Sequence, residues 1–155
     1  MRDVPSVSSR PIPPPLIMLL GLLLELALGR WLPLERWLPA PARYAGAPLL
    51  AVGVFLSVWA ALLFRRAHTG LRPFSPATQL VARGPYRFTR NPMYLGMTIL
   101  LVGVAIMTGA LTPFLVPPLF MIVITLLFIR YEEAQMHRTF GADYDAFKRK
   151  VRRWL

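Results

Sequence analysis

Four long apolar runs, separated by short polar segments, dominate the chain. They cover residues 16–29, 46–64, 93–110 and 111–129. Each run approaches the roughly 20 residues that a helix needs to cross a bilayer, so the pattern predicts four transmembrane helices. The last two runs meet almost directly, which predicts a tight helical hairpin.

The first run contains Glu25, and a carboxylate is expensive at membrane depth. We expect Glu25 to face a neighbouring helix or to lie near the interface; the alternative is a functional role, for example in a transport pathway.

The composition favours a membrane protein over a soluble globule. Hydrophobic residues make up 55% of the 155 residues and charged residues only 16%. We therefore expect a single all-α integral membrane domain over residues 1–155. The chain has no cysteine, which excludes disulfides and Cys-ligated zinc. His68 and His137 have no partner at metal-ligand spacing, so no metal site is expected.

The net charge of +11 lies beside the apolar runs. Residues 65–91 contain six arginines and no acid, and residues 130–155 contain seven Lys and Arg against four acids. The hairpin brings both segments to one side, which the positive-inside rule assigns to the cytoplasm together with both termini. Loop 30–44, which carries three arginines, would then face outward. We expect contact with membrane lipids and not with nucleic acid, in the inner or plasma membrane of a bacterium or archaeon.

The last apolar run leads into a polar helix that should stop near Gly141. After it, residues 143–154 combine one apolar face with many Lys and Arg residues. This pattern predicts an amphipathic helix that lies on the membrane surface, with Asp143 as its N-cap.

The segment "RGPYRFTRNPMYLG", residues 83–96, lies at the start of the third run. Asn91 followed by Pro92 is a strong helix start. The free N–H groups of that first turn, next to the positive charge of Arg90, make an anion site. Tyr94 lies one turn further in. The simpler interpretation is a capped span with a positive flank and an aromatic anchor.

Two adjacent carboxylates, Glu132 and Glu133, follow the fourth run on the same side of the membrane. They would either form ion pairs with nearby arginines or await a cationic ligand. An anion site on one side, with carboxylates and tyrosine faces on the other, suits a zwitterion that carries an additional positive charge.

Two stretches, "LVARGPYRFTRNPMYLG" and "EEAQMHRTFGADYDAFKRKVRRWL", resemble the isoprenylcysteine carboxyl methyltransferase and phospholipid methyltransferase superfamily. These are integral membrane enzymes that use S-adenosylmethionine. The resemblance covers residues 78–155, and the separated motifs LV-x-x-G-x-Y, R-[HN]-P-x-Y-x-G and E-E occur in the right order. It implies that residues 78–155 form the cofactor-binding catalytic half of the domain, and that residues 1–77 supply the N-terminal spans. It implies a methyltransferase whose cofactor is S-adenosylmethionine and whose partner is a lipophilic acceptor.

The resemblance also implies site residues. Those implied to bind the cofactor are Gln79, Leu80, Val81, Tyr86, Asn91, Pro92, Met93, Tyr94 and one glutamate of the pair. We take this glutamate to be Glu132, and the alternative is Glu133, because adjacent residues on a helix point about 100° apart. The eukaryotic prenylcysteine enzymes usually have His where this chain has Asn91, which can hydrogen-bond but cannot act as a base.

The expected reaction is direct displacement of the methyl group, with Arg90 and Glu133 as the candidate catalytic residues. Arg90 suits the carboxylate of the cofactor. Glu133 would serve as the base for a neutral amine acceptor, whereas a carboxylate or thiolate acceptor needs no base. The alternatives are a non-catalytic membrane module that keeps the motif for packing, and a small carrier. The acceptor and the oligomeric state stay open.

Overall fold

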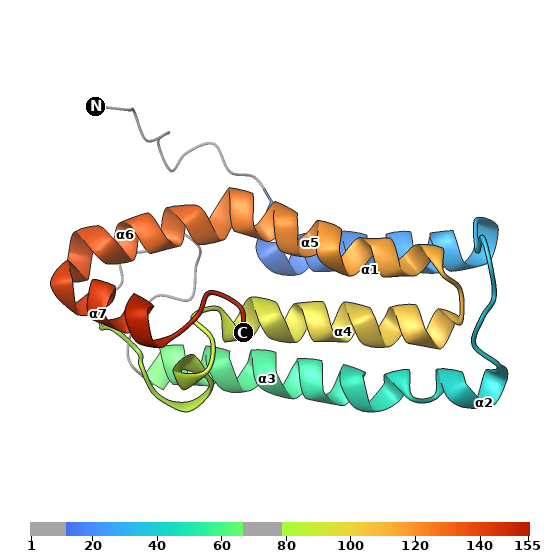
Figure 1. Cartoon of the computed structure of the whole chain (residues 1–155), viewed down its shortest axis with the longest axis horizontal. Coiled ribbons are helices and arrows are strands. Elements are labelled where there is room, and N and C mark those ends of the chain that lie inside the picture. Colours follow the sequence, from blue (N-terminus) through green and yellow to red (C-terminus); the bar gives the residue numbers. More distant parts are fainter. Residues whose placement is uncertain (1–11, 67–78) are drawn as a thin grey trace.

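The computed structural model describes residues 12–66 and 79–155, and in this part of the chain the regular elements are helices (Figure 1). Three helical stretches are apolar and long enough to cross a membrane, and the apolar helix Pro92–Thr108 has 17 residues. The expected all-α membrane fold with about four spans is therefore confirmed. The helices are α1 (Pro14–Trp31), α2 (Ala40–Arg43), α3 (Gly46–Arg66), α4 (Pro92–Thr108), α5 (Val116–Ile124), α6 (Arg130–Phe140) and α7 (Ala142–Lys150).

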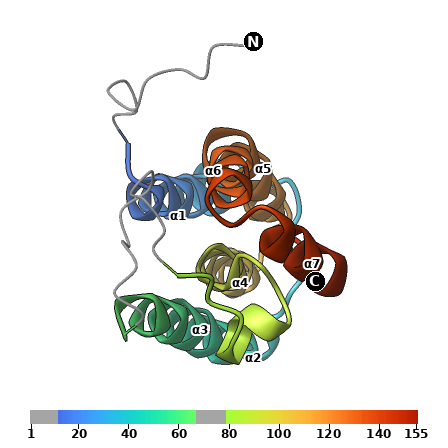
Figure 2. The same ribbon diagram turned by 90° about the vertical axis from the view of Figure 1, so that its left-hand side faces the viewer.

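Helix α4 is the centre of the bundle. It has α3 on one side and α1 with α5 on the other (Figures 1 and 2). Its turn to α5 runs through Gly109 and the 3-10 helix Thr112–Leu115, which forms the expected hairpin. Because α4 is apolar on every face, it can be enclosed by its neighbours without burying charge.

Four glycines let α3 and α4 approach closely. Gly53 lies against Gly96, and Gly46 lies against Gly103. A Cβ atom on Gly53 would be only 2.6 Å from the carbonyl oxygen of Gly96, so the two backbones touch. The two glycines of each helix are seven residues apart, which is about two turns, so the four glycines form one continuous seam. Ser57, beside this seam, donates a hydrogen bond to the carbonyl of Met93 (3.1 Å).

We call the end of the bundle where α3 finishes and α4 begins the motif end. Helix α1 starts there, and α6 and α7 lie there too (Figure 1). Gly141, at φ +51°, makes the turn between α6 and α7. The expected helix over 143–154 is shorter than predicted and ends at Lys150. Beyond it the chain is extended, because residues 151–153 pair with the segment before α4.

Glu25 is fully buried in α1, and neither of its carboxylate oxygens has a hydrogen-bond partner among the described residues. Gly21 and Gly29, one turn to either side on the same face, contact α4 and the region around the start of α5. Glu25 therefore faces the neighbouring helices, which was one of the two positions expected for it; the other was the membrane interface. A buried polar group without a partner weakens the fold.

We predict that Glu25→Leu stabilises the protein. Removing an unpaired buried polar group while keeping a similar volume should raise the free energy of unfolding by about 1–3 kcal/mol. Thermal melting in detergent measures the change, with Glu35→Leu on the exposed loop as the control. A lower melting temperature for Glu25→Leu would mean that the carboxyl group has a stabilising partner.

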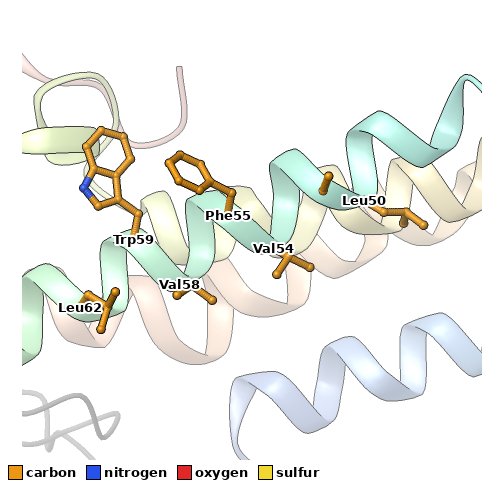
Figure 3. A pocket seen from close by; sticks show the side chains of 7 residues that line it. Leu50, Val54, Phe55, Val58, Trp59 and Leu62 are labelled. Carbon is orange, nitrogen blue, oxygen red and sulfur yellow. The ribbon is translucent and has the colours of Figure 1, made fainter.

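The exposed face of α3 carries an apolar groove of about 550 Å³ (Figure 3). Apart from the indole N–H of Trp59, its side chains have no polar group, so it suits lipid chains and not a charged cofactor. The side chains that line it come from Leu50, Ala51, Val54, Phe55, Val58, Trp59 and Leu62.

Candidate functional site

The loop before α4 is fixed against the end of α3. Gly84 adopts φ +60°, and a Cβ atom there would be 2.6 Å from the side chain of Leu63. Only glycine combines this left-handed backbone with so close an approach. Next to it, Val81 and Tyr86 are buried together with Ala60 of α3. The glycine of the LV-x-x-G-x-Y motif thus has a structural reason, and the loop is rigidly seated.

Tyr94 and Glu132 come together from α4 and α6. The Tyr94 hydroxyl donates a hydrogen bond of 2.8 Å to Oε1 of Glu132. Among the described residues, no Lys, Arg or His side chain forms an ion pair with Glu132. This carboxylate is therefore left without a positive partner at the motif end.

Tyr86 belongs to the same group. Its hydroxyl is buried and has no hydrogen-bond partner among the described residues. Burial and the nearby carboxylate of Glu132 raise the pKa of Tyr86 well above its ordinary value. Its hydroxyl therefore stays protonated and is available as a donor or an acceptor.

Glu133, the adjacent carboxylate, is fully paired. Arg90 donates to its Oε1 at 2.8 Å, and Arg153 donates to both oxygens at 3.0 and 2.6 Å. The hydrogen bond to Glu133 raises the pKa of the Arg153 guanidinium. The two glutamates thus differ sharply, because two arginines neutralise Glu133 and none neutralises Glu132.

Asn91 stands at the N-cap position of α4, but its side chain does not cap the helix. Its amide donates instead to the main-chain carbonyl of Arg153 (2.9 Å). Thr89 donates to the same carbonyl at 3.0 Å. The expectation that Asn91 caps α4 through its side chain is therefore wrong, and the first-turn N–H groups have no side-chain cap.

The remaining predicted cofactor residues surround this cluster to different extents. Gln79 is exposed and Leu80 is half-buried, at the point where the described chain resumes. Pro92 is fully buried, and Met93 packs against the core formed by Val81 and Tyr86. The side chain of Val81 is buried within that core.

Two features of the site escape sequence reasoning. One is the π-helical segment Thr125–Ile129, which directly precedes α6 and changes the direction in which Glu132 and Glu133 project. The other is Arg153, which lies 20 residues from Glu133 and is one of several basic residues in the tail. Neither has a local signal in the sequence, although the E-E pair predicted either ion pairs with arginines or a cationic ligand.

In a comparison with protein families, the model of phospholipid methyltransferases matches residues 42–143. This is well over half of the chain, and it includes the motif loop, α4 and both glutamates. The chain belongs to the phospholipid methyltransferase family. The search of curated proteins found no match, and the search of solved structures found none.

Membership in the phospholipid methyltransferase family confirms the resemblance noted in the sequence. The matched region begins upstream of the two quoted stretches and includes all of α3. This agrees with the structure, in which the glycine seam and the packing at Gly84 make α3 part of the support of the motif loop. The family and the apolar helices together indicate a membrane methyltransferase.

Proposed function

We propose that this protein transfers the methyl group of S-adenosylmethionine to a lipophilic acceptor, at the motif end of the bundle and on the cytoplasmic side of the membrane. The observation that carries the proposal is the unpaired charge of Glu132. A half-buried carboxylate that shares its environment with two tyrosines, and that has no basic partner among the described residues, is poised to receive a cation.

The residues around Glu132 fit the charges of this cofactor. Glu132 would accept the ammonium group, and the rings of Tyr86 and Tyr94 would face the positively charged sulfur. The uncapped first turn of α4 would receive the carboxylate through its N–H groups. S-adenosylmethionine would supply the methyl carbon, which forms a bond to the acceptor as its bond to sulfur breaks and the electron pair stays on sulfur.

The pairing of Glu133 bears on the chemistry of the acceptor. A carboxylate that accepts hydrogen bonds from two guanidinium groups is a weak base. We therefore assign Glu133 a structural part in the site, together with Arg90. An acceptor that is already an anion, such as a carboxylate or a thiolate, needs no base and is compatible with this arrangement. A neutral amine would have to lose its proton to another group.

One experiment tests both the reaction and its side of the membrane. Sealed inverted vesicles and sealed right-side-out vesicles that contain the protein are given labelled S-adenosylmethionine, which is charged and does not cross the bilayer. We expect labelled lipid only in the inverted vesicles, and extraction and mass analysis then identify the acceptor. Labelling only in right-side-out vesicles would reverse the orientation. No labelled lipid in either preparation, with a bacterial total lipid extract present, would contradict the proposed reaction.

A further inference from the structure

The last residues of the chain form a strap across the start of α4. We use this name, the C-terminal strap, for residues 151–155. The backbone of Arg152 pairs with Thr89 in a parallel bridge, and its carbonyl accepts a hydrogen bond from the N–H of Arg90 (3.0 Å). The strap also accepts the two side-chain hydrogen bonds from Thr89 and Asn91 already described. Three consecutive residues before α4 are thus held by the tail.

Trp154 anchors the strap in the bundle. It packs against the core cluster that contains Tyr94, together with residues of α5. Val151, at the beginning of the strap, is buried. The strap is therefore a docked element of the fold and not a loose end.

Arg153 connects the strap to α6. Its carbonyl holds Thr89 and Asn91, while its guanidinium grips both oxygens of Glu133. A bidentate guanidinium–carboxylate contact fixes orientation as well as distance. Arg153 therefore fixes the position of the start of α4, which carries Tyr94, relative to the turn of α6 that carries Glu132.

Adjacent residues on a helix project about 100° apart, so fixing Glu133 also fixes the direction of Glu132. Arg90 alone contacts one oxygen of Glu133 and leaves the carboxylate free to rotate. Without Arg153, Glu133 would keep only the contact of Arg90 to Oε1, and its Oε2 would be free to compete with Glu132 for a cation nearby.

We propose that Arg153 is a positioning residue of the site: it holds Glu133 so that Glu132 alone presents an unpaired carboxylate beside Tyr94. This rests on the proposed function, because the ligand positioned in this way is the cofactor. The strap gives the tail of the chain a direct part in cofactor binding, although Arg153 itself need not touch the cofactor.

The test compares Arg153→Gln with Arg152→Gln in the full chain, by isothermal titration of S-adenosylmethionine in detergent. Both positions make main-chain hydrogen bonds in the strap, but the side chain of Arg152 is exposed and forms no ion pair among the described residues. We expect Arg153→Gln to weaken binding about ten-fold or more, as loss of a group that orients a ligand residue commonly does. Arg152→Gln should stay within about two-fold of the parent.

Two further variants separate positioning from general stability. Arg153→Lys keeps the charge but not the two parallel hydrogen bonds, so its affinity should fall between those of the parent and Arg153→Gln. The double variant Glu133→Gln with Arg153→Gln should bind no more weakly than Glu133→Gln alone, since both changes break one contact. Additive losses would overturn the proposal.

Melting curves of each variant show whether the protein is folded. A lower melting temperature with an unchanged dissociation constant for Arg153→Gln would make Arg153 merely structural and overturn the proposal. If Arg153→Gln gives no folded protein, Arg153→Lys carries the test, and parental affinity there has the same meaning. If the parent itself does not bind S-adenosylmethionine, the proposed function fails first, which the parent titration alone reveals.

Discussion

Glu132→Gln should weaken the binding of S-adenosylmethionine by about ten- to a hundred-fold. The amide keeps the size of the side chain, and its oxygen can still accept the hydrogen bond from Tyr94. What the variant loses is the negative charge. A hydrogen bond to a charged group is worth about 1.5–3 kcal/mol, and this corresponds to the stated range of affinity.

The control for this variant is Glu35→Gln, which removes a carboxylate of the exposed loop between α1 and α2 at the opposite end of the bundle. Its affinity should equal that of the parent, because a distant exposed charge contributes little. The stability of Glu132→Gln should be close to that of the parent or higher, since the change removes a half-buried charge that has no counter-ion among the described residues. If both variants bound the cofactor like the parent, Glu132 would not be the ammonium site.

Much of the fold could be predicted because hydrophobic burial in a bilayer depends on local sequence. The apolar run 46–64 became α3, Gly46–Arg66, and the run 93–110 became α4, Pro92–Thr108. The hairpin followed from the absence of a linker between two spans. Helix boundaries shifted by a few residues, because prolines and glycines at the ends and not the apolar runs decide where a helix starts and stops.

The division of labour between Glu132 and Glu133 could not be predicted. Their side chains project about 100° apart, so a small rotation of α6 exchanges their roles. The π-helical segment Thr125–Ile129 adds such a rotation, and no residue pattern in the sequence predicted this segment. The sequence indicated that the pair would meet either arginines or a cation. Within the described part of the chain, Glu133 forms ion pairs with two arginines and Glu132 forms none.

The tail illustrates a second limit. Residues 143–154 have helical periodicity, yet the helix stops at Lys150. The chain is extended and not helical after Lys150, because polar groups of Thr89, Arg90 and Asn91 donate hydrogen bonds to the strap. These contacts join segments that are about 60 residues apart in the sequence. Local patterns cannot reveal such a contact. Val151 and Trp154, which the helical pattern assigned to a membrane-facing surface, pack against the protein instead.

The glycine seam leads to the prediction with the largest effect on the fold: Gly96→Leu should prevent α3 from docking on α4. Even a single methyl group at Gly96 would lie 2.6 Å from the carbonyl oxygen of Gly53 and 2.8 Å from the backbone nitrogen of Ser57. These are backbone atoms, so a neighbouring side chain cannot rotate away to make room. Gly96→Ala should therefore cost about 1–3 kcal/mol of stability, the usual range for overpacking, and Gly96→Leu more.

Gly21→Ala is the matched control, because Gly21 is also a helical glycine inside the bundle. Its Cβ atom would meet only side chains, the nearest being that of Val116 at 3.3 Å. A small shift relieves that contact, and alanine favours the helix by about 1 kcal/mol over glycine, so Gly21→Ala should be close to neutral. Gly96→Ala gains the same helix preference and should still melt at a lower temperature. Since α3 also seats Gly84 and holds Met93 through Ser57, the folded fraction of Gly96→Ala should bind S-adenosylmethionine more weakly than the parent. Melting temperatures and titrations of Gly96→Ala and Gly21→Ala that coincide would show that close contact of the two helices is not what supports the site.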